Sequence, residues 1–138
     1  MKSVTWISRM IDLQALWVLV VLIWAALLWI LSADSHPPMG PSFPMKDKLL
    51  HGMYFTGGTG AFLLAQRGHR WIHLPFFHMA LTGMIFAGLI GALDEYHQTF
   101  TPGRSGNDPW DWLADICGGY LGAGLLHVAL KRWAKDAH

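Results

Sequence analysis

Charged side chains are scarce in this chain. Asp, Glu, Lys and Arg make up 14% of its 138 residues, and hydrophobic residues make up 53%, whereas a soluble globular domain carries about 25% charged residues. This deficit excludes an ordinary water-soluble surface and predicts a membrane protein. The formal net charge is only +1, so the composition indicates no nucleic-acid partner.

Cysteine is almost absent as well. Cys117 is the single cysteine, which excludes a disulfide bond within the chain and leaves the redox compartment unreadable from cysteine usage. Because Cys117 lies in an apolar stretch, we expect it to pack rather than to act as a nucleophile. The length of the chain suits one domain, residues 1–138.

The sequence contains long apolar segments. Four of them cover residues 13–33, 48–66, 72–93 and 110–130. The first has only Gln14 and Ser32 as polar members and reaches the roughly 20 residues that a spanning helix needs. It exceeds the roughly 7–15 apolar residues of a signal peptide, which disfavours cleavage. We therefore expect an all-α protein, an integral membrane four-helix bundle.

The cationic residues predict how such a bundle lies in the membrane. Four spans place both termini on one side, together with the turn between the second and third spans. That side receives Lys2, Arg9, Arg67, Arg70, Lys131, Arg132 and Lys135, and the other receives Lys46, Lys48 and Arg104. Cytoplasmic loops are enriched in Lys and Arg, so we expect both termini to be cytoplasmic.

The same topology gathers three polar groups at the extracytoplasmic face. They are Asp47, Lys48 and His51; then Asp94, Glu95, His97 and Gln98; then Arg104, Asn107, Asp108, Asp111 and Asp115. Part of the third group is explained by helix capping, because Asp108 precedes Pro109 as an N-cap precedes a first-turn proline. Asp94 and Glu95 instead close a helix, where the dipole disfavours negative charge. Ionisable groups at membrane depth are costly and mark function.

Two chemistries fit these groups. In the first, Arg104 binds an anionic head group through its planar fork of donors, while Asp47 orients His51 as an acid or base. In the second, His51, His97, Glu95 and Asp115 hold a divalent metal. The second is weaker, because the sequence contains no standard zinc spacing such as His-Glu-x-x-His, and no metal site is assigned. An internal partner for Arg104 is the alternative to a ligand, Glu95 being the best choice.

Several segments of the chain resemble the VanZ-like membrane protein family. They are DKLLH at residues 47–51, EYHQ at 95–98, PGR at 102–104 and DWLADICG at 111–118, and the resemblance covers about residues 44–126. The family often has Asn where this chain has Asp115. The resemblance implies a small multi-pass protein of the bacterial cytoplasmic (inner) membrane. The founding member is linked to low-level resistance to the glycopeptide teicoplanin, but resistance is not inferred for this chain.

The leading functional hypothesis is recognition, and possible further modification, of an envelope lipid or lipid-linked precursor at the extracytoplasmic face. The candidate acid and base groups are His51, Glu95 and Asp115, and the candidate ligand-binding residues are Asp47, Lys48, Gln98, Arg104 and Asp111. The alternative is a non-catalytic membrane protein whose polar cluster locks the helices or engages a partner. A small transporter or metal-ion protein is a weaker alternative. The sequence indicates no cofactor, substrate or oligomeric state.

Overall fold

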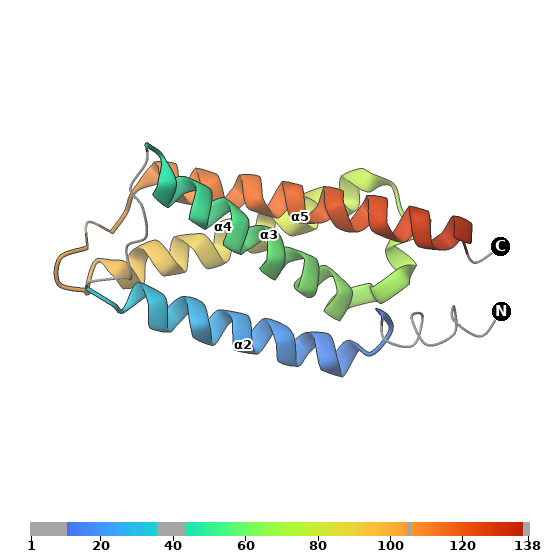
Figure 1. The fold of residues 1–138 in the computed structure, drawn as a ribbon, viewed down its shortest axis with the longest axis horizontal. Helices are drawn as coiled ribbons and strands as arrows, with labels where there is room; N and C mark the ends of the chain where they lie inside the picture. Colours follow the sequence, from blue (N-terminus) through green and yellow to red (C-terminus); the bar gives the residue numbers. More distant parts are fainter. Residues whose placement is uncertain (1–10, 36–43, 105, 137–138) are drawn as a thin grey trace.

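The computed structural model describes residues 11–35, 44–104 and 106–136. These residues form four α-helices: α2 (Gln14–Ser32), α3 (Lys46–Arg67), α4 (Phe76–Gln98) and α5 (Pro109–Asp136); the short 3-10 helix η1 (Gly68–His73) joins α3 to α4. Successive helices run in opposite directions, so α2 begins and α5 ends at the same end of the bundle (Figure 1). The expected all-α four-helix bundle is confirmed.

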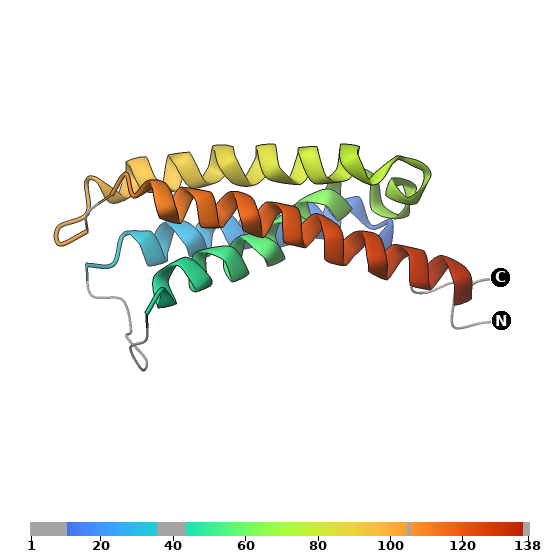
Figure 2. The ribbon, with the colours of Figure 1, turned by 90° about the horizontal axis from the view of Figure 1, so that it is seen from above.

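The helices differ in how well they suit a membrane. In the described part of the chain, α2, α4 and α5 are long and apolar enough to cross one. Helix α3 is 22 residues long but less apolar, because it begins with Lys46, Asp47 and Lys48 and is rich in Gly and Thr. It packs against α2, α4 and α5 and crosses the bundle obliquely (Figures 1 and 2). The second predicted segment is therefore a helix of the bundle, and its passage through the membrane stays a prediction.

Glycines allow α5 to lie directly on α3 and α4. A Cβ atom placed on Gly122 would lie 2.5 Å from the carbonyl oxygen of Thr56 in α3, and one placed on Gly119 would lie 2.6 Å from the carbonyl oxygen of Gly83 in α4. Real Cβ atoms do not approach an oxygen so closely, so only glycine fits at these two crossings. The four-residue spacing of Gly83, Ala87 and Gly91, and of Gly118 and Gly122, in the sequence predicts such close helix packing, and the structure confirms it.

Helix α4 begins and ends later than its predicted segment, residues 72–93. It begins at Phe76 because the residue before a proline avoids helical geometry, and Leu74, which precedes Pro75, is extended with ψ 150°. It continues to Gln98, so Asp94 and Glu95 belong to its last turns and remain fixed by the helix backbone.

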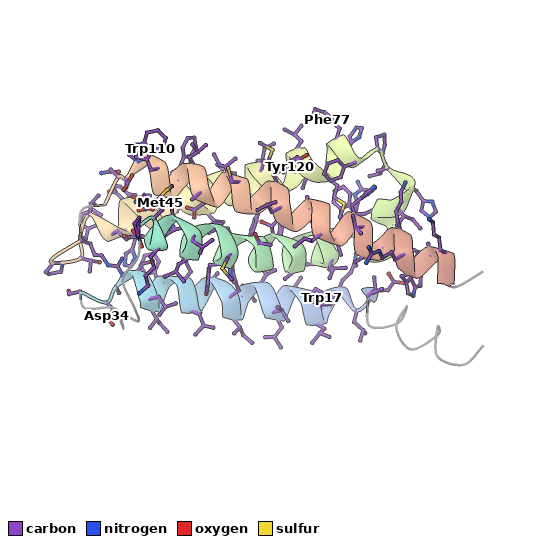
Figure 3. All side chains as sticks on the ribbon, turned by 45° about the horizontal axis from the view of Figure 1, so that its top comes forward. Trp17, Asp34, Met45, Phe77, Trp110 and Tyr120 are labelled. Carbon is purple, nitrogen blue, oxygen red and sulfur yellow. The ribbon has the colours of Figure 1, made fainter. Side chains whose placement is uncertain are left out.

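Helix α2 contributes mostly outward-facing apolar side chains, as Figure 3 shows along its free face. A reciprocal pair of hydrogen bonds joins it to α3: the Trp24 indole donates to the carbonyl oxygen of Tyr54 at 3.2 Å, and the Tyr54 hydroxyl donates to that of Trp24 at 2.8 Å. The apolar core lies nearer the end of the bundle where α2 begins and α5 ends. It is formed around Leu63, Trp71, Met79, Ala123 and Leu130. At the opposite end, α2 and α4 finish and α3 and α5 begin. We call it the polar end, because buried polar side chains occupy it.

Candidate functional site

Buried carboxylates occupy the polar end. Asp94 and Glu95 at the end of α4 are each 5% exposed, and Asp111 and Asp115 at the start of α5 are 6% and 0% exposed. His51, one turn into α3, is half-buried between them. The structure thus brings together side chains from all three predicted polar groups. Burying so many carboxylates is costly unless each has a partner, so the partners decide what this end can do.

Lys48 joins the starts of α3 and α5. Its ammonium group lies 2.7 Å from a carboxylate oxygen of Asp108, 2.8 Å from one of Asp111 and 3.8 Å from one of Asp47. The hydrogen bond from Lys48 holds the pKa of the Asp108 carboxyl below its usual range. Asp108 also accepts the Trp110 backbone N–H at 2.8 Å, which confirms it as the N-cap of α5.

His51 is held by Asp115. The Nδ1 atom of His51 lies 2.9 Å from Oδ1 of Asp115, whereas the second oxygen, Oδ2, has no hydrogen-bond partner within the described part of the chain. The expectation that Asp47 orients His51 is therefore wrong. The Asp47 side chain is 61% exposed and lies beside Lys48, because it sits one turn nearer the start of α3 than His51.

The end of α4 is tied to α2 and to the loop before α5. Asp94 accepts hydrogen bonds from the Ser32 hydroxyl and from the Gln98 side-chain amide, the latter at 2.9 Å. Glu95 accepts the backbone N–H of Asp108 at 2.6 Å through Oε2, while its buried Oε1 has no hydrogen-bond partner in the described ranges. Ser32 was not a predicted site residue, although a lone hydroxyl in an otherwise apolar segment is a signal that could have found it.

Arg104 lies at the end of α2 rather than beside Glu95. Its Nε donates to the carbonyl oxygen of Asp34 at 3.2 Å, and Nη2 donates to that of Leu31 at 3.1 Å. Cationic side chains stabilise the carbonyl-rich C-terminus of a helix in this way. The alternative in which Glu95 is the internal partner of Arg104 is wrong, because Glu95 accepts the backbone N–H of Asp108 in the loop before α5 instead.

His97 does not join the other metal-ligand candidates. Its ring stacks on Trp29 of α2, with centroids 3.6 Å apart and planes at 18°, so the predicted set of His51, His97, Glu95 and Asp115 is not assembled. Two other groups in the described residues have donor atoms within 4.8 Å of one another: His51 with Asp94 and Glu95, and His51 with Asp47 and Asp111. His51 is common to both groups.

A groove of about 1480 Å³ opens beside these polar groups. Its walls come from α2, α3 and α5 and are mainly apolar, with Leu28, Leu50 and Phe55 among them. The polar side chains that line it are Ser32, Ser35, Lys46, Asp47, Lys48, His51, Tyr54, Asp94, Gln98 and Arg104. Asp34, Met45 and Trp110 mark this end of the bundle in Figure 3. The groove therefore offers an apolar chamber with one polar end.

Comparisons of the chain with protein families, with curated proteins and with solved structures give no match. What the site can do must therefore be argued from its own geometry. That geometry offers space for an amphiphilic molecule, a histidine fixed by a carboxylate for proton transfer, and carboxylate oxygens suited to a cation.

Proposed function

We propose that this chain is a multi-pass membrane protein that binds an envelope lipid or lipid-linked precursor. The groove carries the proposal, because an apolar wall that ends in polar side chains matches a molecule with an apolar tail and a polar head. The tail would lie along Leu28, Leu49 and Leu50, which line the groove. The head would meet the polar end.

The cations at the polar end determine how a head group would be held. Arg104 uses two of its N–H donors on the carbonyl oxygens of α2, and a guanidinium group has five. The remaining donors suit a phosphate or carboxylate. Lys48 is already paired with Asp108 and Asp111, so Arg104 is the better head-group contact of the two.

His51 is the residue best placed for chemistry on such a ligand. It lines the groove, and Asp115 holds its Nδ1 at 2.9 Å, which fixes the ring and leaves Nε2 to exchange a proton. Glu95 stays a candidate through its free oxygen. A non-catalytic role is the second candidate function, because the Lys48 ion pairs and the Ser32–Asp94 hydrogen bond also lock α2, α3, α4 and α5 together.

Membership of the VanZ-like family is part of this proposal. Its support is that the resembling segments, residues 47–51, 95–98, 102–104 and 111–118, all lie at the polar end. We place that end outside the cytoplasm, because Arg67, Arg70, Lys131, Arg132 and Lys135 belong to the opposite end. Reporter fusions at the C-terminus and in the loop before α5 should report opposite sides of the membrane.

Cys117 provides a direct test of lipid binding. It is exposed, lines the groove and is the only cysteine, so a bulky maleimide should fill the groove at one known position. We expect lipid that co-purifies with the chain to be lost after labelling, as measured by lipid-resolved mass spectrometry. The Cys117→Ala variant is the matched control, and it should keep its lipid under the same treatment.

Complete labelling of Cys117 with unchanged lipid retention would mean that the groove does not hold the tail. If lipid is lost as expected, His51→Gln separates binding from chemistry: a catalytic role predicts that lipid remains bound while its modified product disappears, and a structural role predicts that no modified product exists in either protein.

A further inference from the structure

We propose that His51, Asp94 and Glu95 form a binding site for a divalent cation of the Zn²⁺ or Mn²⁺ class. Each of the three offers a donor atom, and these atoms lie within 4.8 Å of one another. The imidazole comes from α3 and the two carboxylates from the last turns of α4, so rigid helices hold all three. This inference goes beyond lipid binding and does not depend on it. A bound cation would take the place of the acid–base role of His51, because Nε2 cannot hold a metal and exchange a proton at the same time.

An unsatisfied oxygen points to a missing ligand. Glu95 is 5% exposed, and its Oε1 has no hydrogen-bond partner among the described residues, although Oε2 accepts the Asp108 N–H. A buried polar atom left without a partner costs about 1–3 kcal/mol. A cation between Glu95, Asp94 and His51 would remove that cost. Among the described residues, each oxygen of Asp94 accepts one hydrogen bond. A carboxylate has about four lone-pair sites, so Asp94 retains capacity for a metal.

The surroundings of His51 fit a metal ligand. Histidines that bind metals almost always donate their other ring N–H to a carboxylate or carbonyl group, which fixes the tautomer. Asp115, which is 0% exposed, occupies that position at 2.9 Å from Nδ1. His51 and Asp94 both line the groove, so a cation has a route to the site from outside the bundle.

The rival group of His51, Asp47 and Asp111 is less suited to a cation. Lys48 lies 2.8 Å from Asp111 and 3.8 Å from Asp47, so its positive charge already occupies that position and would repel a metal. The donor types decide which metal is preferred at either group. An imidazole together with carboxylates favours Zn²⁺ or Mn²⁺, whereas oxygen ligands alone favour Mg²⁺ or Ca²⁺. The favoured site is therefore the one on the α4 side of His51.

The test is a titration with metal alone. The purified full chain is treated with a chelator and titrated with Mn²⁺, and free Mn²⁺ is followed by electron paramagnetic resonance. We expect one tightly bound Mn²⁺ per chain, displaced by Zn²⁺, with a nitrogen coupling from His51 in the pulsed spectrum. Asp115→Asn should weaken binding by about 10–100-fold, as for other partners of metal-bound histidines, and Glu95→Gln should weaken it further.

Matched variants make the outcome decisive. Glu95→Gln keeps a carbonyl oxygen for the Asp108 N–H, and Asp47→Asn serves as the control that should leave affinity unchanged. Circular dichroism of each metal-free variant checks folding, and Asp94→Asn replaces Glu95→Gln if the latter fails to fold. The proposal is overturned if the unmodified chain binds Mn²⁺ no more tightly than Glu95→Gln, if no nitrogen coupling is seen, or if Asp47→Asn weakens binding as strongly as Glu95→Gln.

Discussion

Two glycines of α5 allow the close contact between α5 and α3 to be tested with an internal control. A Cβ atom on Gly122 would meet the Thr56 carbonyl oxygen at 2.5 Å and the Thr59 Cβ at 3.1 Å, whereas one on Gly124 would meet nothing within 4 Å. Both residues lie in the same helix, two positions apart. Changing each to alanine therefore adds the same methyl group to two different surroundings.

The expected magnitudes follow from these distances. Replacing glycine by alanine inside a helix gains about 0.5–1 kcal/mol from reduced backbone freedom, and this gain is shared by both variants. Inserting a methyl group into a packed contact costs about 1–3 kcal/mol, and Gly122→Ala alone bears that cost because its nearest neighbour is the backbone oxygen of Thr56, which cannot rotate away as a side chain can. We expect Gly124→Ala to be slightly more stable than the parent, and Gly122→Ala to be about 1–3 kcal/mol less stable than Gly124→Ala.

The free energy of unfolding can be measured by titrating the purified protein from mild detergent into sodium dodecyl sulfate, with circular dichroism as the signal. The difference between the two variants is more informative than either value, because the helix-propensity contribution cancels. Equal stability of Gly122→Ala and Gly124→Ala would refute the backbone-to-backbone packing of α5 on α3.

Three further changes test the polar end and the attachment of α2. Asp108→Ala and Asp108→Asn both remove the ion pair with Lys48, but asparagine can still cap α5. Asp108→Ala should therefore lower the free energy of unfolding by about 0.5–2 kcal/mol more than Asp108→Asn; equal losses would contradict a capping role. Arg104→Lys should lower the free energy of unfolding by about 0.5–1.5 kcal/mol through loss of one hydrogen bond to α2. Adding Glu95→Gln to this variant should not recover stability, and a recovery would show that Arg104 and Glu95 do pair. Tyr54→Phe should cost about 0.5–1.5 kcal/mol in the same titration, and no change would show that its hydroxyl does not hold Trp24.

Much of the fold could be predicted because its signals are local. Each helix shows a long apolar segment, and the glycine spacing in α4 and α5 predicted close packing that Gly83 and Gly119 confirm. Helix α3 is less apolar than the other three, because it begins with Lys46, Asp47 and Lys48 and is rich in Gly and Thr, and its passage through the membrane stays a prediction. It packs against the three other helices.

The partners within the site could not be predicted in the same way. Spacing shows which residues share a helix face, but the rotation of one helix against another decides which faces meet. His97 follows Glu95 by two residues, about 200° around a helix of 3.6 residues per turn, so it turns to Trp29 when Glu95 turns inward. His51 meets Asp115 across the bundle rather than Asp47 on its own helix, which no single-helix pattern reveals.

The charge of the polar end links the two proposals. The sequence favoured an anionic ligand held by Arg104 and Lys48, yet the structure directs Lys48 to Asp108 and Asp111 and two donors of Arg104 to α2. The groove is lined by Lys46, Lys48 and Arg104 as well as by Asp47 and Asp94. An anionic head group beside His51 would therefore meet repulsion from Asp94, whereas one beside Arg104 would meet that residue's remaining donors. A divalent cation bound beside His51 would make the local charge there positive instead of negative. A filled cation site would therefore let an anionic head group lie beside His51 as well as beside Arg104.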